Sequence, residues 1–476
     1  MWTRLRTVVS GCQRIVCTLY LRSVITIGMQ DLHPVHPPSE SAVQTTRELI
    51  HDQSFCHRHR TSQKHFTRRR KLPFMNVVVL LLQKSVRSIQ LHLHDFFEAL
   101  SPNSPTVKTA SWCEARLKLS HTAFIELNER AILDVVYGQD SDFEVRRWKG
   151  HRLIAIDSSL VRLPNEEALG NEFGWAESNN QAGGCGRYPQ ARLSALTDVL
   201  NRIVLQTLFV PWEQGERDLA LQHTKALEPA DIAILDRGYA SYELWAQFID
   251  QDRKFVCRCP ASSFSIIDEL FKANQSGRSV VVTLEPSKKK RAKIRRAGLP
   301  EEIQVRFVTV RLSTGELEVL ATNLLDEQRY PTQEFEELYN RRWGIETYYG
   351  LIKSRLDLEN FTGLSVEAVR QDLHATIFVS NFESILIQPA QEQVRQKSKS
   401  LKNPQQVNHA VSFHALKSQI IRLLLSSEPV PQVLPKLQQL FQDNPVSNRP
   451  RRKAPRKKKS AWRSYHFQRN IRKVVF

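Results

Sequence analysis

The spacing of hydrophobic positions changes along the chain, and each change predicts a different kind of structure. From Thr109 to about Tyr137, apolar residues recur with helical period between charged ones, which predicts a small helical domain. From Arg152 the apolar residues form short continuous runs, separated by polar and glycine-rich loops. Such runs are typical of buried strands, and strands alternating with helices predict an α/β core with a central sheet.

A third pattern lies between Phe255 and about Leu325. Several short apolar segments occur there, with STGE as a hairpin turn, which indicates an antiparallel, β-rich insertion. The basic run Lys288–Arg296 inside it is too charged for a core, so we expect a projecting loop that touches DNA or is merely solvated. After Pro331 helical periodicity returns and continues to about Leu425.

Charge is the strongest signal in the composition. The 476 residues include 68 Lys and Arg against 49 Asp and Glu, a formal net charge of +19, which favours a polyanionic partner. Residues 57–71 carry seven Lys and Arg without an acid, and residues 449–476 carry twelve. We expect the first segment to be an arm that contacts phosphates or is only solvated. The second should be a disordered tail that binds nucleic acid by counterion release or acts only as a solubilising segment.

Other features of the sequence exclude membrane and disulfide-rich proteins. No stretch reaches 18 uninterrupted apolar residues, so we expect no membrane span. The seven cysteines follow no regular framework and have no zinc-finger spacing, which is typical of a reducing compartment. The proline-rich segment 33–41 indicates a linker, and residues 1 to about 40 could be an artefact of the assigned start.

Two aspartates each follow an apolar run of the predicted sheet. Asp157 stands in LIAIDSS and Asp236 in IAILDRGY. A carboxylate near a strand end of an α/β sheet lies in the crevice where such folds bind ligands. Because a buried carboxylate without a partner is costly, we expect a metal ion or a cation beside both.

The stretch YNRRWGIETYYGLIK carries a third carboxylate. On one α-helix, Tyr339, Arg342, Glu346 and Lys353 would fall within an arc of roughly 60°. The set suits a metal ion held against a nucleic-acid phosphate, with Glu as ligand and Arg and Lys as phosphate partners. Taken by itself, the stretch is explained equally well by an ordinary solvated helix face that the ion pair between Arg342 and Glu346 stabilises.

The order and spacing of these motifs resemble those of a known family. The series Tyr, two residues, Arg, three residues, Glu, six residues, Lys is similar to the signature of the insertion sequence 4 family of DDE transposases. The segments IAIDSSLVRLP, EQGERDLAL and LDRGYASYEL also resemble family segments, and the similarity extends from about residue 75 to about residue 425. Ser158 departs from this pattern, because the family has a glycine directly after the first aspartate.

The resemblance implies a ribonuclease-H-like catalytic core, interrupted by a β-rich insertion between the second aspartate and the glutamate. It implies that Asp157, Asp236 and Glu346 bind two Mg²⁺ ions, for which Mn²⁺ would substitute. Tyr339, Arg342 and Lys353 would grip phosphates beside the cleaved bond. Arg237 is another candidate phosphate contact or a structural ion pair, and we expect Trp343 to pack in the core.

The implied activity is cut-and-paste transposition of a bacterial insertion sequence, with hydrolysis at the element ends, a hairpin intermediate and strand transfer. The partners would be double-stranded DNA and a second copy of the chain, in the cytoplasm and associated with the nucleoid. A metal-dependent DNA nuclease without strand transfer and an inactive DNA-binding relative remain alternatives.

The same patterns predict seven regions. They are a poorly ordered N-terminal extension and basic arm (1–71), a helical N-terminal DNA-binding domain (72–149), the first part of the ribonuclease-H-like core (150–254), the β-rich insertion (255–330), the second part of the core with the Glu-bearing helix (331–385), a helical C-terminal region (386–448) and a basic disordered tail (449–476).

Overall fold

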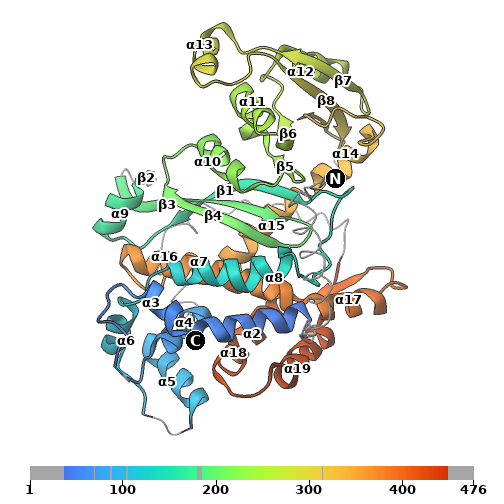
Figure 1. Ribbon diagram of the computed structural model, residues 1–476. Coiled ribbons are helices and arrows are strands. Elements are labelled where there is room, and N and C mark those ends of the chain that lie inside the picture. The colour runs from blue at the N-terminus through green and yellow to red at the C-terminus, as the bar shows by residue number, and fades with distance from the viewer. Residues whose placement is uncertain are drawn as a thin grey trace, which may run out of the picture. The chain divides into compact units, whose positions relative to one another are not determined.

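The computed structural model describes residues 37–448, apart from residues 69, 86–87, 103–104, 180–184 and 313–314. The first 36 residues and the predicted basic tail, 449–476, therefore lie outside the described residues. The described part has a mixed α/β fold, as the sequence predicted, with a large sheet between helices (Figure 1). None of the described helices is both long and apolar enough to cross a membrane.

Among the described residues, nine strands form one sheet with the order β2-β3-β1-β5-β6-β9-β8-β7, and β4 pairs with β3. The strands are β1 (Leu153–Arg162), β2 (Trp175–Asn179), β3 (Cys185–Asp198), β4 (Ile203–Pro211), β5 (Ile232–Leu235), β6 (Lys254–Cys259), β7 (Ser279–Leu284), β8 (Ile303–Arg311) and β9 (Leu317–Thr322). Strand β1 is antiparallel to β3 and parallel to β5, which is in turn parallel to β6.

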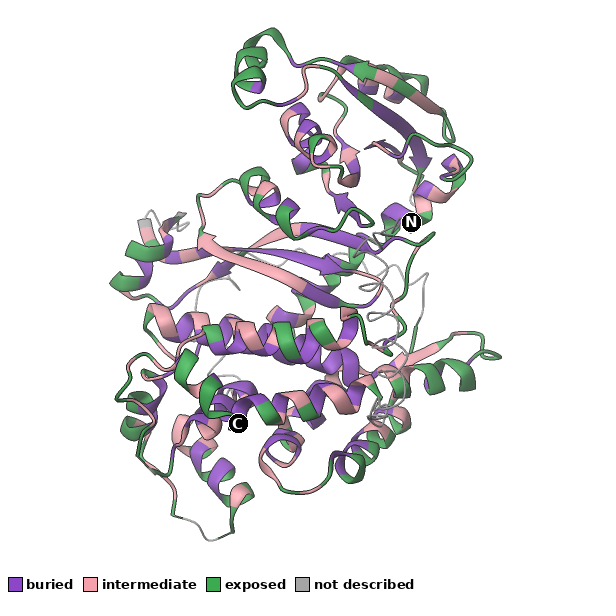
Figure 2. Ribbon diagram, in the orientation of Figure 1, coloured by how far each residue is buried: buried purple, intermediate pink, exposed green. Residues whose placement is uncertain are grey.

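The middle of this sheet is buried on both faces. Residues 153–156 of β1 and all of β5 are buried, as expected for continuous apolar runs in parallel strands (Figure 2). Strands β7, β8 and β9 confirm the antiparallel strands predicted between residues 255 and 330. They extend the same sheet through the pairing of β6 with β9.

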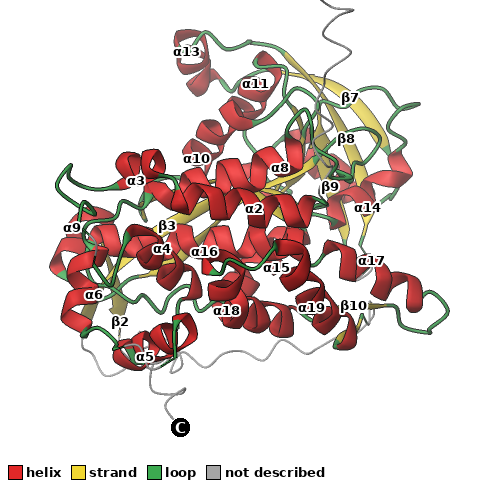
Figure 3. Ribbon diagram, turned by 60° about the horizontal axis from the view of Figure 1, so that its bottom comes forward, coloured by secondary structure: helices red, strands yellow, loops and turns green. Residues whose placement is uncertain are grey.

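Helices from both ends of the chain cover one face of the sheet. They are α2 (Pro38–His51), α3 (Gln53–His59), α4 (Phe74–Gln83), α5 (Ile89–Leu100), α6 (Thr109–Arg116), α7 (Thr122–Asn128), α8 (Asp134–Tyr137), α16 (Val366–Leu386), α17 (Gln388–Lys397), α18 (His409–Leu425) and α19 (Val430–Asp443). A π-helical segment, Glu129–Leu133, joins α7 to α8. Helices α2 and α16 lie in front of β3 in Figure 3.

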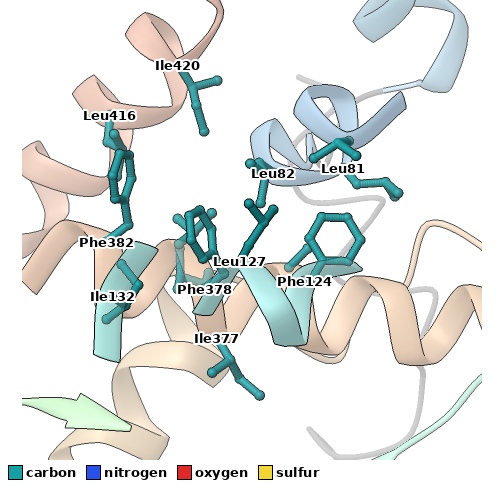
Figure 4. Packing of buried hydrophobic residues seen from close by; sticks show 14 of the residues in the cluster. Leu81, Leu82, Phe124, Leu127, Ile132, Ile377, Phe378, Phe382, Leu416 and Ile420 are labelled. Atoms are coloured by element: carbon teal, nitrogen blue, oxygen red, sulfur yellow. The ribbon is translucent and has the colours of Figure 1, made fainter. Parts of the chain in front are cut away.

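One hydrophobic cluster joins the N-terminal and C-terminal helices. Leu82 of α4, Phe124 of α7, Phe378 and Phe382 of α16 and Leu416 of α18 are members of it (Figure 4). Helix α16 is buried along most of its length, because it packs against α4, α7 and β4. The helical region predicted from Thr109 to about Tyr137 is thus confirmed, and it shares its core with the C-terminal helices.

Two other helices cover the second face of the sheet, including strands β8 and β9. They are α11 (Tyr242–Asp250) and α12 (Ser265–Ala273), which share a hydrophobic cluster with β5, β6, β8 and β9. Helix α9 (Glu167–Phe173) packs on β3 and β4, and α10 (Glu216–His223) packs on β1. The short pair β10 (Gln405–Val407) and β11 (Pro445–Ser447) lies beside α17.

The structure differs from the sequence prediction at two segments. The prediction of a linker over residues 33–41 was wrong for residues 38–41, because α2 begins at Pro38. Proline suits the first turn of a helix. Ala42 and Val43 of α2 are fully buried, so this part of the predicted poorly ordered extension belongs to the core. The basic run is the helix α13 (Lys288–Arg296) and not a loop, because Lys and Arg are good helix formers and Ile294 is buried.

Candidate active site

Asp157 and Asp236 stand at equivalent positions of two neighbouring parallel strands. The last paired residues of β1 and β5 are Ile156 and Leu235, and each aspartate follows directly. Asp236 lies just beyond β5 with extended backbone, so it continues the line of the strand. Because in-register residues of neighbouring strands point to the same face, the two carboxylates lie side by side.

The alternation of buried residues shows which face the carboxylates take. Ile156 and Leu235 pack in the cluster that contains α11. The aspartates, one position later, point to the opposite face. Two further helices supply residues to the hydrophobic clusters on that face: α14 (Phe335–Asn340), with Tyr339, and α15 (Trp343–Ser354), with Ile345.

Helices α14 and α15 carry the four residues of the predicted helix face. The expectation of one continuous helix was wrong, because the two helices are joined by a tight turn. There the Arg342 N–H donates to the Tyr339 carbonyl at 3.0 Å, a bond that spans three residues instead of four. Tyr339 therefore belongs to α14, Arg342 precedes α15, and Glu346 and Lys353 lie in the first and last turns of α15.

Two hydrogen bonds align α15 with β1. The Tyr349 hydroxyl donates to the Asp157 carbonyl at 2.8 Å, and the Lys353 ammonium donates to the Leu160 carbonyl. Tyr349 and Lys353 are one helical turn apart. Glu346 lies about one turn before Tyr349, towards the N-terminal end of α15.

Arg342 lies among the three predicted metal ligands. Its guanidinium is almost completely buried, with the residue 2% exposed, and donates to Glu346 Oε1 at 2.7 Å. Burial lowers the pKa of Arg342, but the neighbouring Tyr339, Asp236 and Glu346 raise it further, so it stays above its ordinary value. The guanidinium also acts electrostatically on Asp157.

Burial governs the electrostatics of Asp157. It raises the pKa of this carboxyl to about 6. Two effects lower the pKa and partly offset this rise: the Ser158 N–H donates to Asp157 Oδ1 at 2.8 Å, and Arg342 carries a positive charge. The carboxylates of Asp236 and Glu216 raise it as well. Since removal from water disfavours the charged form, Asp157 needs a further cation to stay ionised at low pH.

Tyr339 contacts the second aspartate. Its hydroxyl donates to Asp236 Oδ1 at 3.4 Å, a long bond, and burial raises the pKa of the phenol well above its ordinary value. The Arg342 guanidinium lies over the Tyr339 ring, 5.6 Å from its centroid. Tyr339 and Arg342 thus contact each other beside the carboxylates.

Lys353 and Arg237 lie apart from this group. Lys353 pairs with Glu359 at 3.5 Å, near Leu160 of β1. Arg237 is exposed at the start of a 3₁₀ turn, Arg237–Tyr239, and forms no ion pair with the described residues. The structural ion pair considered for Arg237 is therefore absent within the described part of the chain.

Trp343 corrects another expectation. The side chain is not packed in the core, because the residue is 48% exposed at the first position of α15. The Arg342 guanidinium lies over the Trp343 ring, 5.1 Å from its centroid.

Arg258 is a residue that the sequence alone did not single out. Leu235 of β5 pairs with Cys257 of β6, so Arg258 stands beside Asp236 in the next row of the sheet. Its guanidinium lies 4.0 Å from Asp236 Oδ1 and also pairs with Glu318. The only sequence feature that could have pointed to Arg258 is its position between two cysteines in a predicted strand.

A second group lies on the other side of Asp157. Ser158 Oγ donates to Glu216 Oε1 at 2.6 Å, and Arg192 donates to the same carboxylate oxygen at 2.6 Å. Glu216 belongs to the segment EQGERDLAL of the sequence. It is a fourth carboxylate near the pair, held by Ser158 and Arg192.

The donor chemistry of the group suits a divalent metal ion. Asp157, Asp236 and Glu346 offer hard carboxylate oxygens, the ligands that Mg²⁺ and Mn²⁺ prefer. Within the described residues, no three side chains of His, Cys, Asp or Glu lie together as a preformed metal cluster. Arg342, whose Nε is buried without a hydrogen-bond partner, lies among the carboxylates instead.

Comparison with known proteins places these residues in a family. Residues 148–382 match the family model described as Transposase DDE domain. The chain is 26% identical over 239 residues to the transposase InsG for insertion sequence element IS4 of Escherichia coli strain K12, covering 49% of this chain and 52% of InsG. These matches identify residues 148–382 as a DDE transposase domain and support an insertion sequence 4 family DDE transposase.

Another relative and a solved structure also match this chain. The putative transposase y4zB of Sinorhizobium fredii is 26% identical over 246 residues, covering 50% of this chain and 61% of y4zB. The chain thus spans between about half and three fifths of the length of these two relatives. A piggyBac transposase in a synaptic complex with hairpin DNA aligns with a TM-score of 0.39 and 9% identity, over 87% of each chain.

The DDE domain contains every predicted site residue. Residues 148–382 run from just before β1 through α15 and into α16, and they include the three carboxylates, Arg237 and the series from Tyr339 to Lys353.

Proposed function

We propose that this DDE transposase family member is the transposase of a bacterial insertion sequence and acts by metal-dependent phosphoryl transfer on DNA. The observation that carries the proposal is the position of Asp157 and Asp236 side by side on parallel strands. Glu346 is connected to this pair through Arg342, whose guanidinium donates to it. The strand order β4-β3-β1-β5-β6, with β1 antiparallel to β3 and parallel to β5, supports a ribonuclease-H-like core.

Asp157, Asp236 and Glu346 would hold two Mg²⁺ ions, or Mn²⁺ in their place. Bound there, the ions would activate the attacking oxygen and stabilise the leaving oxygen of an in-line displacement. The raised pKa of Asp157 supports this assignment, because a divalent cation would favour the charged carboxylate that burial disfavours.

The cationic and phenolic side chains would bind the DNA phosphates. Arg342 can fork two phosphate oxygens, and it would then exchange Glu346 for the phosphate and release that carboxylate to the metal site. Tyr339 would orient the same phosphate beside Asp236. Lys353, as a point charge, and the exposed Arg237, through its guanidinium, would bind phosphates further along the strand.

The reaction would take place in successive displacements at phosphorus. Water attacks the phosphodiester at the element end, the bond from phosphorus to the 3′ oxygen breaks, and a 3′ hydroxyl forms. The family resemblance suggests that this hydroxyl next attacks a phosphodiester of the opposite strand, displaces the 3′ oxygen of the flanking DNA and closes a hairpin, which a second water opens. The restored 3′ hydroxyl then attacks a target phosphodiester, displaces the 3′ oxygen of the target strand and joins the element to it.

The resemblance also suggests the setting of the reaction. Two copies of the chain would bridge two element ends, and the substrates would be double-stranded element ends and target DNA. The net charge of +19 supports a nucleic-acid substrate. We place the protein in the cytoplasm, associated with the nucleoid.

The test uses the full chain, DNA carrying the element ends, and a target plasmid. Asp157→Asn, Asp236→Asn and Glu346→Gln should each abolish Mg²⁺-dependent cutting and leave end binding intact, while Asp268→Asn, an exposed carboxylate of α12, should cut normally. Full cutting by any of the first three would overturn the site. Cut ends that never join the plasmid would identify a nuclease without strand transfer.

A further inference from the structure

We infer that α13 is a docking surface for the sugar-phosphate backbone of duplex DNA, separate from the catalytic carboxylates. The inference rests on the proposed function, because it takes DNA as the substrate. Seven of the nine residues of α13 are Lys or Arg, and the helix has no acid. Figure 2 shows it almost entirely exposed.

The anchoring of α13 leaves one of its faces towards solvent. Ile294 is 1% exposed and packs in the cluster of α11, and Lys293 pairs with Glu243 of α11 at 2.8 Å. Arg295 pairs with Glu301 at 2.8 Å, and Arg291 with Glu285. These contacts hold the helix by its Ile294 side and use three of its seven cations. A fourth, the exposed Lys290, lies on the same side of the helix as Ile294.

The remaining face combines three cations with a small residue. At about 100° per residue, Lys288, Lys289 and Arg296 fall within an arc of about 100° centred near Ala292, on the side away from Ile294. All three are exposed, and none has an ion pair with the described residues. This face extends about 12 Å along the helix, and Ala292 lets it approach a flat surface closely.

The unpaired cations of the first turn, Lys288 and Lys289, do not serve the stability of the helix. Like charges one turn apart, such as Lys289 and Lys293, destabilise a helix, and cations in the first turn oppose its dipole. A polyanion laid along the face would relieve both effects. The arrangement therefore fits a bound partner better than a surface selected for solubility.

Contacts with neighbouring elements fix α13 on the protein. Its partner Glu243 lies seven residues after Asp236, and the neighbouring Tyr242 hydroxyl donates to the Pro300 carbonyl at 2.9 Å, just beyond α13. Asp218 of α10 adds a further attraction on Lys293. The helix is thus fixed to the segment that follows the second aspartate in the chain, on the α11 side of the sheet.

The experiment measures equilibrium binding of the full chain to a random-sequence duplex, without divalent metal, between about 50 and 200 mM salt. The triple variant Lys288→Gln, Lys289→Gln, Arg296→Gln keeps good helix formers and should reduce the slope of log affinity against log salt by two to three, about 0.9 per lost phosphate contact. The control Lys397→Gln, Lys399→Gln, Lys402→Gln removes the same charge from exposed residues near α17 and should change the slope by less than one.

A further variant separates charge from folding. Lys288→Arg, Lys289→Arg, Arg296→Lys keeps all charges and should bind as the unaltered chain does. An equal change of slope in both glutamine triples, or none in the α13 triple, would overturn the inference for α13 alone. Absence of any duplex binding by the unaltered chain would overturn the proposed function as well.

Discussion

Arg342 donates to Glu346 across one turn at the start of α15, and the same guanidinium lies within electrostatic reach of Asp157 and Asp236. A cation fixed there neutralises part of the charge that the three carboxylates bring together. It therefore stabilises the group before any metal ion binds.

We expect Arg342→Gln to make the stability of the protein depend on metal. Loss of a buried guanidinium that pairs with acids should cost about 3 kcal/mol in metal-free buffer. Because Mg²⁺ would then relieve the repulsion among the carboxylates, it should raise the Tm of Arg342→Gln more than that of the unaltered chain. Thermal unfolding with EDTA and with Mg²⁺ measures this, and an equal gain in both proteins would show that Arg342 does not neutralise the group.

Ser158→Ala tests the position at which this chain departs from the family pattern. The change removes the hydroxyl that donates to Glu216, while Arg192 still holds that carboxylate. The free energy of unfolding should fall by about 1 kcal/mol, and cutting of DNA should persist. Chemical denaturation and a cleavage assay measure the two effects. Complete loss of cutting would mean that the Ser158 hydroxyl takes part in the reaction.

Arg116→Met should destabilise the protein strongly. Arg116 of α6 pairs with Asp372 of α16 at 2.8 Å, and the two side chains are 4% and 0% exposed. Without the guanidinium the buried Asp372 loses its ion-pair partner, so we expect a loss of about 3 to 5 kcal/mol in chemical denaturation.

Arg130→Met is the matched control for Arg116→Met. Arg130 pairs with Glu126 at 3.5 Å and its side chain is 51% exposed, so its removal should cost less than about 1 kcal/mol. Similar losses in the two variants would contradict the role of burial.

The buried His223 predicts loss of stability in mild acid. Burial lowers the pKa of His223 to about 4, and its ring contacts Gln206 at 2.8 Å and Ser194 at 3.0 Å. Between about pH 4 and 6.5 the unfolded chain binds a proton that the folded chain does not. The contribution of neutral His223 is thus complete above about pH 6.5, and about 3 kcal/mol is lost as the pH falls to 4.

His223→Gln gives the comparison for this pH dependence. Glutamine cannot take up the proton, so the free energy of unfolding should change less between pH 6.5 and 4 than in the unaltered chain. The measurement is chemical denaturation at a series of pH values. An unchanged pH profile would assign the acid sensitivity to other groups.

Local pattern was sufficient for the strands that carry the aspartates. The runs that end before Asp157 and Asp236 are continuous and apolar, and the structure buries both as parallel neighbours. The partner that each strand takes depends on contacts between distant segments. Arg258 shows the result, because its place beside Asp236 follows from pairing of β5 with β6 and not from its neighbours in sequence.

Helical period was less reliable at the third carboxylate. The residue types from Tyr339 to Lys353 allow one helix, but the structure tightens one turn between α14 and α15. A difference of one hydrogen-bond span is below what side-chain spacing specifies. Charge likewise suggested a loop at 288–296, where one buried isoleucine and three ion pairs hold a helix.

Each of the two aspartates lies the same number of residues after a residue that pairs with its counterpart on the neighbouring strand. This equal spacing has an evolutionary consequence. Asp157 follows Leu153 by four residues and Asp236 follows Ile232 by four, and Leu153 pairs with Ile232. Gain or loss of one residue in either interval would turn a carboxylate to the other face of the sheet. Glu346 is positioned instead by the contact of α15 with β1. The loops between Asp236 and Glu346 are therefore free to lengthen or shorten among descendants of this chain, whereas the two four-residue intervals are not.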